Sequence, residues 1–360
     1  MIKNRNIADD AGIMAHKVLG FGRAKVLYVG GSSWKNKGES TQVETPSGFK
    51  SWISGKAKLG DNLFLTVQEA VIASTGSRGD VIVVGPVKIQ ENVWVVNRPA
   101  IKILGTSHSW EHQWRASDGS TAGPHKYGYV GNYGTGGYLE TGGTGLIIMS
   151  RSVEVSGFLF DSDGGCAGIY VGDGDALAAN ATSGANFIVH VNAGVGLDDG
   201  DSMSTDQNAG GAWIHHNTFV NGYYGIGLEG ASANTLIENN VFDKPDYSVF
   251  VGGYSSRSNQ RQIIRDNEFH ADASGYGVFV TSMTGGNVGT LIARNTFRDG
   301  SSLAFTYAVS TAGSGVSSIV GNIFACANPV SAQSTDFFSG NFLASAGNAP
   351  HYVQDSTNSV

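Results

Sequence analysis

The stretch IHHNTF, residues 214–219, recurs along this 360-residue sequence and decides its fold. The shared element is Ile, two variable residues, Asn, one residue and Phe. Four further copies, IENNVF, IRDNEF, IARNTF and IVGNIF, begin at Ile237, Ile264, Ile292 and Ile319. Their asparagines stand at positions 217, 240, 267, 295 and 322, so the intervals are 23, 27, 28 and 27 residues. Self-similarity at such a period is the signature of a repeat architecture.

A second short strand is predicted between successive copies. The segments are GIGL at 225–228, SVFV at 248–251, GVFV at 277–280 and YAVS at 307–310. Each repeat is therefore a strand, an Asn corner, a Phe, a loop and another strand. Such a unit cannot bury its apolar face alone, but stacked units share one continuous core. The sequence predicts an all-β solenoid of roughly nine to eleven coils between residues 80 and 345.

The repeated Asn and Phe each have an expected structural role. Asn tolerates left-handed backbone angles, and its amide satisfies main-chain groups at a tight corner. We expect the amides of successive coils to form a buried ladder of Asn217, Asn240, Asn267, Asn295 and Asn322. Aromatic rings at one position of each coil favour an interior stack, here of Phe219, Phe242, Phe269, Phe297 and Phe324.

Upstream of the repeats, TVQEAVIAST from Thr66 precedes GDVIVVGPVKIQENVWV at 79–95. Together these segments resemble the start of the pectate-lyase-like right-handed parallel β-helix superfamily, found among tailed-phage virion surface proteins. The resemblance implies a right-handed parallel β-helix with a short N-terminal amphipathic capping helix, whose apolar face is Val67, Ala70 and Val71. The sequence departs from that pattern at GPVKIQE. Because many activities use this scaffold, the resemblance specifies the fold more than the function.

Three divisions of the chain follow. Residues 1–60 are expected to form an N-terminal arm, residues 61–345 the β-helix, and residues 346–360 a polar tail. Within the arm, IADDAGIMAHKVLG at 7–20 resembles short segments of phage appendage and decoration proteins, which implies attachment to a virion. The alternatives are a leader without structure or an additional capping strand.

Two interruptions of the repeat are candidate binding segments. The insertion at 106–143 suits either a glycan platform or a protein interface, and its aromatic residues are Trp110, Trp114, Tyr127, Tyr129, Tyr133 and Tyr138. The second interruption, between 172 and 211, is rich in Asp. Its residues Asp198, Asp199 and Asp201 are candidate ligands for Ca²⁺, which prefers oxygen donors, or are solvated loop acids.

The amino-acid composition limits the kinds of binding partner that can be expected. There are 52 glycines and only 15% charged residues, which suits many short strands and turns. A net charge of -7 gives no reason to expect nucleic acid as a partner. No apolar run reaches the ~20 residues of a membrane-spanning helix, and the N-terminus lacks an export signature. We therefore expect synthesis in a cytoplasm and no membrane span.

Three functions stay open. The preferred one is a structural virion surface protein of a tailed phage, a capsid decoration or tail-appendage protein that binds capsid or tail proteins; the homotrimer is implied by the resemblance to viral β-helices. The second is a polysaccharide lyase or glycosidase, for which Asp199 with Asp201, or Asp161 with Asp163, are possible carboxylate pairs. The third is a non-catalytic module that binds a host surface glycan. No catalytic residue and no cofactor is predicted, apart from the Ca²⁺ alternative.

The adjacent His215 and His216 invite a metal-site interpretation, but their columns hold unrelated residues in the other repeats. Successive strand residues also point to opposite faces, so we expect that the two rings cannot easily chelate one ion. The sequence therefore favours Ile214, Asn217 and Phe219 as the informative residues of this stretch.

Overall fold

The structure is a computed structural model. It describes residues 24–29, 61–85, 88–90, 93–105, 128–132, 145–162, 167–171, 210–220, 222–229, 232–243, 245–252, 261–271, 275–281, 288–300, 304–311, 316–344 and 351–352.

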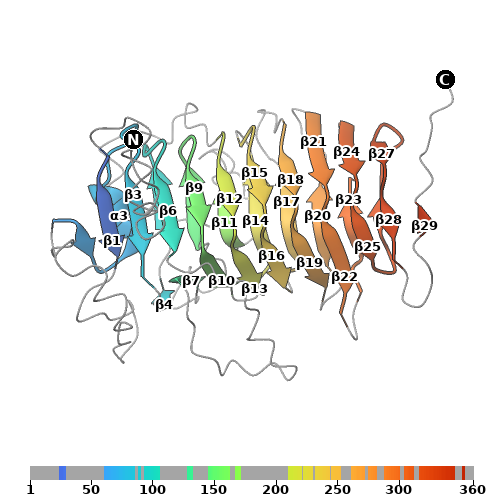
Figure 1. The fold of residues 1–360 in the computed structure, drawn as a ribbon, viewed down its shortest axis with the longest axis horizontal. Coiled ribbons are helices and arrows are strands. Elements are labelled where there is room, and N and C mark those ends of the chain that lie inside the picture. Colours follow the sequence, from blue (N-terminus) through green and yellow to red (C-terminus); the bar gives the residue numbers. More distant parts are fainter. Residues whose placement is uncertain are drawn as a thin grey trace, which may run out of the picture.

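The chain coils into a solenoid whose strands form three sheets running along one axis (Figure 1). All strand pairs in the described residues are parallel except β28 with β29, which is antiparallel. Each coil contributes one strand to each sheet, so the neighbour of a strand lies one repeat away in sequence. This arrangement confirms the predicted all-β, right-handed parallel β-helix and the resemblance to the pectate-lyase-like superfamily.

The sheets are numbered in the order in which one coil visits them. The first sheet consists, in spatial order, of β2 (Leu63–Phe64), β1 (Val26–Val29), β3 (Val81–Val84), β6 (Lys102–Gly105), β9 (Glu154–Ser156), β12 (Trp213–His215), β15 (Leu236–Glu238), β18 (Ile263–Arg265), β21 (Val288–Ala293), β24 (Val316–Val320) and β27 (Phe337–Ser339). The second consists of β29 (His351–Tyr352), β28 (Phe342–Leu343), β25 (Ile323–Ala325), β22 (Thr296–Asp299), β19 (Glu268–Ala271), β16 (Val241–Asp243), β13 (Thr218–Val220), β10 (Phe158–Ser162), β7 (Gly128–Asn132) and β4 (Lys88–Gln90). The third consists of β26 (Val330–Ser331), β23 (Tyr307–Ser310), β20 (Tyr276–Val280), β17 (Tyr247–Gly252), β14 (Tyr224–Glu229), β11 (Ala167–Val171), β8 (Leu146–Met149) and β5 (Val93–Val96).

The single described helix, α3 (Val67–Ala73), lies against β1, β2, β3 and β5 at the N-terminal end of the solenoid. It begins with a capping box, in which the Thr66 hydroxyl accepts from the Glu69 N–H at 3.1 Å and the Glu69 carboxylate accepts from the Thr66 N–H. Its buried residues Val67, Ala70 and Val71 belong to the main core. The predicted amphipathic capping helix is therefore present, on the predicted face.

A buried carboxylate fixes the first coil. Asp80 is fully buried and accepts hydrogen bonds from the backbone N–H groups of Lys25 and Thr75, at 2.7 and 2.8 Å. The Arg78 guanidinium forms an ion pair with the same carboxylate. These contacts join the residue before β1, the end of α3 and the start of β3. Asp80 therefore holds together segments that are 55 residues apart.

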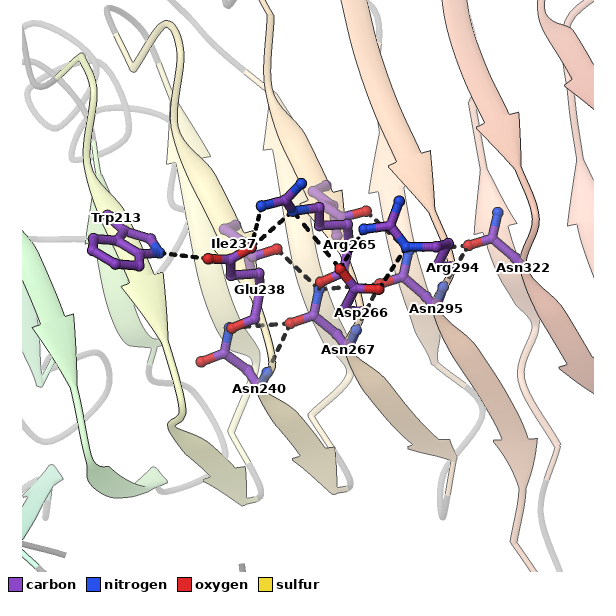
Figure 2. A network of polar contacts seen from close by, with 11 residues as sticks. Trp213, Ile237, Glu238, Asn240, Arg265, Asp266, Asn267, Arg294, Asn295 and Asn322 are labelled. Atoms are coloured by element: carbon purple, nitrogen blue, oxygen red, sulfur yellow. Dashed lines mark hydrogen bonds and ion pairs between the residues drawn. The ribbon is translucent and has the colours of Figure 1, made fainter. Parts of the chain in front are cut away.

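The ladder asparagines are buried and joined in one chain of hydrogen bonds (Figure 2). Each Nδ2 donates to the Oδ1 of the next rung, at 3.0 to 3.1 Å, from Asn217 through to Asn341. Each Oδ1 also accepts from the backbone N–H of the preceding rung, and the Asn217 Oδ1 ends the series by accepting from the Phe158 N–H at 3.1 Å. The amides thus occupy donors and acceptors that the corner of each coil would otherwise leave buried and unpaired.

From the sequence we expected the Asn of each corner to have the left-handed backbone angle. In the structure the residue before the Asn has it. The φ angles are 55° at His216, 55° at Asn239, 56° at Asp266, 54° at Arg294 and 66° at Gly321. The ladder Asn follows this turn, so that its side chain can point into the solenoid and reach the neighbouring rung. A variable residue can take the left-handed angle because the hydrogen bonds of the following Asn side chain hold the backbone of the corner in place.

The interior phenylalanines stack face to face. Adjacent rings from Phe160 to Phe324 have centroids 4.6 to 5.1 Å apart and planes within 11° of parallel. Opposite the rings, one aligned position of the third sheet holds a small residue in every coil. These residues are named here the small-residue column: Gly168, Gly225, Ser248, Gly277 and Ala308. A Cβ at Gly225 would lie 2.8 Å from the Phe242 ring, and one at Gly277 would lie 2.7 Å from the Phe297 ring. The phenylalanine stack therefore requires small residues in the small-residue column of the third sheet.

Other predicted segments are described only in part. From the expected arm, β1 pairs with β2 and β3 inside the first sheet. From the insertion at 106–143, only β7 is described, and it pairs with β4 and β10. From the expected tail, β29 pairs with β28. No described helix is long and apolar enough to cross a membrane.

Candidate functional site

Charged side chains lie along the outer surface of the first sheet and at the corners that follow its strands, named here the charged face: Lys102, Glu154, His215, Glu238, Arg265, Asp266 and Arg294. The strand register places Glu154 beside Lys102, and places His215, Glu238 and Arg265 in one column on successive coils. Their inward neighbours Ile214, Ile237 and Ile264 are fully buried. Alternation along each short strand therefore turns the variable residues of the repeat outward.

Each carboxylate of the charged face has a cationic partner. Glu154 forms an ion pair with Lys102, and its second oxygen lies 3.3 Å from the Nε2 atom of His215. Glu238 accepts from the Nε atom of Arg265 at 2.8 Å and from the Trp213 indole at 3.0 Å (Figure 2).

One coil further, Arg294 binds Asp266 with two hydrogen bonds, at 2.8 and 2.6 Å (Figure 2).

Electrostatics keep Glu154 ionised. Burial alone would raise the pKa of Glu154, but hydrogen bonds from His215 and Lys102 lower it below its ordinary value. A general acid needs the opposite shift, a carboxyl pKa raised toward the working pH. Glu154 therefore acts as the anion of an ion-pair network.

The two adjacent histidines lie close together, although strand alternation would turn them to opposite faces. Their Nδ1 atoms are 2.7 Å apart, and their rings meet edge to face with centroids separated by 5.0 Å. Alternation fails because His216 lies outside β12 and has a φ of 55°, which folds its ring back toward His215. The indole of Trp213 stacks on the His215 ring, with centroids 4.0 Å apart.

The outer surface of the third sheet is different in kind. It carries a row of rings, named here the tyrosine face: Tyr223, Tyr224, Tyr247, Phe250, Tyr276, Phe279 and Tyr307. The register aligns Tyr224, Tyr247, Tyr276 and Tyr307 on four successive coils. Phe250 and Phe279 form a second column beside them. Five of these rings pack with Tyr170 and Ile147 in a hydrophobic cluster separate from the main core: Tyr223, Tyr224, Tyr247, Phe250 and Phe279.

A local irregularity turns these tyrosines outward. In β17, Ser248 faces the phenylalanine stack and Val249 belongs to the main core, so two successive residues point inward. Tyr247, two residues before Val249, then lies on the outer side and contacts Phe250. The same arrangement holds in β14, where Gly225 and Ile226 both point inward and Tyr224 contacts Phe250.

The rings of the tyrosine face hold one another in place. Tyr247 stacks on Tyr276 with centroids 5.1 Å apart and planes 9° from parallel, and it meets Tyr223 at 5.2 Å. Burial, together with the neighbouring tyrosines and Asp246, raises the pKa of Tyr247 to about 12. Burial also raises the pKa of the Asp246 carboxyl. The Tyr247 hydroxyl therefore stays protonated at physiological pH.

Sequence reasoning missed the tyrosine face, although a signal was present. A tyrosine opens the third-sheet segment of four successive repeats, in YGIGL, YSVFV, YGVFV and YAVS. A strict alternation of two would place these tyrosines inside with Ile226 and Val249, so the pattern does not mark them as outward-facing.

Most of the candidate residues chosen from the sequence lie outside the described residues. This applies to Trp110, Trp114, Tyr127, Tyr133, Tyr138, Asp163, Asp198, Asp199 and Asp201. The backbone of Tyr129 lies in β7, and that of Asp161 lies in β10. Among the described residues, no three His, Cys, Asp or Glu side chains come together as a metal site would require.

The three parallel sheets define a parallel β-helix. Similar solved structures include an alginate lyase from Paenibacillus sp. str. FPU-7, with 16% identity, a TM-score of 0.39, and coverage of 75% of this chain and 95% of that one. A pectin methylesterase variant bound to a hexasaccharide has 10% identity, a TM-score of 0.36 and coverage of 82% and 89%. ORF18 of Geobacillus virus E2 has 10% identity, a TM-score of 0.34 and coverage of 95% and 64%.

The family is given by the sequence itself. Residues 145–355, more than half of the chain, match the NosD family, whose description is periplasmic copper-binding protein. The chain belongs to this family. No curated protein of significant sequence similarity was found.

Proposed function

We propose that this chain is a non-catalytic structural protein of the surface of a tailed-phage virion, synthesised in the host cytoplasm. In this proposal it is a homotrimeric capsid decoration or tail-appendage protein. The observation that carries the non-catalytic part is the pairing on the charged face, where Glu154, Glu238 and Asp266 each have a cationic partner. A glycosidase or lyase needs a carboxylate or base that is available to the substrate. The virion part rests on the resemblance of residues 7–20 to appendage proteins.

The interior suits a structural role. The amide ladder runs without a break from Asn217 to Asn341, and the phenylalanine stack runs from Phe160 to Phe324. Each stacked pair contributes about 0.5–1.5 kcal/mol beyond the area that it buries. A solenoid whose neighbouring coils are joined by both devices makes a stiff spacer, because bending it would break bonds in several coils together.

Copper is not part of the proposal, although the family description names it. Copper sites in proteins use imidazole, thiolate or thioether ligands that converge on one point. Here the Nδ1 atoms of His215 and His216 lie 2.7 Å apart and could supply at most two ligands. Among the described residues no further His or Cys joins them. The described part of the chain does not fit a copper centre.

Two measurements test the proposal. Antibodies raised against the purified protein are expected to label gradient-purified virions of the phage whose genome carries the gene, at the capsid or the tail. Labelling of host cells without labelling of virions contradicts the virion role. Incubation with host surface polysaccharide is expected to release neither new reducing ends nor unsaturated uronates. Turnover that survives repurification, and that is lost in a Glu154→Gln variant, contradicts the non-catalytic role.

A further inference from the structure

The amide ladder ends at Asn341, the last rung in the described residues. In every earlier rung the backbone N–H and the Nδ2 of the Asn converge on the Oδ1 of the next Asn, at 2.9 to 3.1 Å. The Nδ2 of Asn341 donates to the carbonyl oxygen of Ile319 at 2.7 Å. Its backbone N–H and its second Nδ2 hydrogen have no partner among the described residues, although Asn341 is only 1% exposed. Buried donors are nearly always paired, so these two call for an acceptor.

The corner before Asn341 keeps the conformation of the other corners. Gly340 has a φ of 62°, within the range of 54° to 66° found at the equivalent residues. The two donors of Asn341 therefore converge, as in the other rungs, on a point along the solenoid axis beyond the last coil. One amide or carboxylate oxygen at about 3 Å from both donors satisfies them together.

The strands around Asn341 leave an open edge beside these donors (Figure 1). β27 pairs with β24 and has no further neighbour among the described strands. Its inward residue Phe338 is partly exposed, whereas the equivalent Ile319 is fully buried. The edge of β28, by contrast, is covered by β29. The accessible site is therefore the backbone edge of β27, the ring of Phe338 and the two donors of Asn341.

A second copy of this chain does not complement this end. The N-terminal end of the solenoid is closed by α3, and the first ladder oxygen, Oδ1 of Asn217, lies behind earlier coils and accepts from the Phe158 N–H. Two C-terminal ends that meet with Asn341 against Asn341 bring donors against donors, and unpaired donors in a contact weaken binding. The end therefore suits a different chain, one that supplies an oxygen acceptor.

We infer that the C-terminal end of the solenoid binds an extended segment of another protein, which pairs in parallel with β27 and places an Asn or Asp oxygen on the two donors of Asn341. The repeat defines the sequence that fits, namely an aliphatic residue over Phe338, two residues, and then the Asn or Asp. In strand addition of this kind the backbone hydrogen bonds give affinity and the side-chain positions give specificity. The inference rests on the proposed function only for the identity of the partner, a capsid or tail protein, and adds the surface that binds it.

The probe is a synthetic peptide with the sequence of residues 288–296, VGTLIARNT, which contains β21 and Asn295. Binding of the labelled peptide to the full chain is measured by fluorescence anisotropy. We expect this peptide to bind, and an Asn295→Ala peptide to bind about 10-fold more weakly, because the acceptor of two hydrogen bonds is lost. An Asn295→Asp peptide keeps the oxygen and is expected to bind. A Thr296→Ala peptide is the control, with unchanged affinity.

Hydrogen exchange of the full chain locates the bound peptide. We expect the peptide to slow amide exchange over residues 337–343 and to leave the N-terminal coils unchanged. Equal binding of the Asn295→Ala peptide overturns the inference, and so does protection of a different part of the chain.

Absence of binding also overturns the inference, and exchange of the free chain then identifies what the donors of Asn341 use instead. Rapid exchange over residues 337–343 assigns the donors to water, and slow exchange assigns them to another segment of this chain. Exchange that slows as the protein concentration rises assigns this end to a second copy. None of these results alters the labelling of virions, so the proposed function is tested separately.

Discussion

Replacing Asn267 by alanine is the most direct test of the amide ladder. Asn267 lies in the middle of the series and is buried. Its Oδ1 accepts from the backbone N–H and the Nδ2 of Asn240, at 2.9 and 3.1 Å. Its Nδ2 donates to the carbonyl oxygens of Ile237 and Arg265 and to the Oδ1 of Asn295, at 3.0, 2.9 and 3.0 Å.

The expected loss follows from these contacts. Alanine leaves the buried N–H of Asn240 without the acceptor that it uses here, which costs about 1–3 kcal/mol. The remaining bonds shared by Nδ2 and Oδ1 contribute about 0.5–1.5 kcal/mol each, and several are lost together. We expect Asn267→Ala to lower the free energy of unfolding by about 3–5 kcal/mol.

Urea unfolding followed by far-UV circular dichroism measures this loss. Thr296→Ala is the control, because Thr296 is half-buried on the outside of β22 and contacts Asn267 only through its backbone N–H, which alanine keeps. Substitutions at such positions change stability by no more than about 0.5 kcal/mol. If Asn267→Ala costs less than about 1 kcal/mol, or no more than Thr296→Ala, the ladder does not stabilise the coils as argued.

Three further predictions concern single buried groups. The hydroxyl of Ser248 is buried and makes no hydrogen bond among the described residues, and Ala308 occupies the equivalent position two coils further on. Ser248→Ala is therefore expected to raise the free energy of unfolding by about 1 kcal/mol in urea melts. A decrease would contradict this. Burial alone would raise the pKa of Asp80, but hydrogen bonds from Arg78 and from two backbone N–H groups lower it below its ordinary 3.8. Its contribution is therefore present above that pH and lost as the pH falls through the folded-state pKa, so the stability gap between wild type and Asp80→Asn should be wide at pH 7 and narrow at low pH; an equal gap at both would refute the assignment. Burial, with a smaller effect of Asp299, raises the pKa of Cys326 to about 12. In a Cys166→Ser background the Cys326 thiol should therefore resist a disulfide reagent at pH 8 until urea unfolds the chain. Rapid reaction in the native state would oppose this.

The repeats made much of the fold predictable. The spacing of Asn217, Asn240 and Asn267 gave the coil length, and the position of Ile before each Asn gave the strand register found in the first sheet. The capping helix was predictable because Thr66 and Glu69 form a recognisable capping box before an apolar face. These features are local, or repeat at a fixed interval, so they can be read without knowing the contacts.

The corner conformation was not predictable in the same way. Asn was the natural candidate for the left-handed angle, yet Asp266, Arg294 and even His216 adopt it. The choice depends on the hydrogen bonds of the following Asn to another coil, and these form only once the coils have stacked. The contact between His215 and His216 is a consequence of the same turn.

The sequence by itself determined the period, the inward columns and the identity of the ladder and the stack. Only the tertiary structure decided what faces outward in the third sheet. The stacked phenylalanines require a small residue at Ser248, and placing Ser248 and Val249 both inward turns Tyr247 out of the core. The tyrosine face therefore exists because packing inside the solenoid overrides the alternation of the strand, and no residue pattern within one coil contains that information.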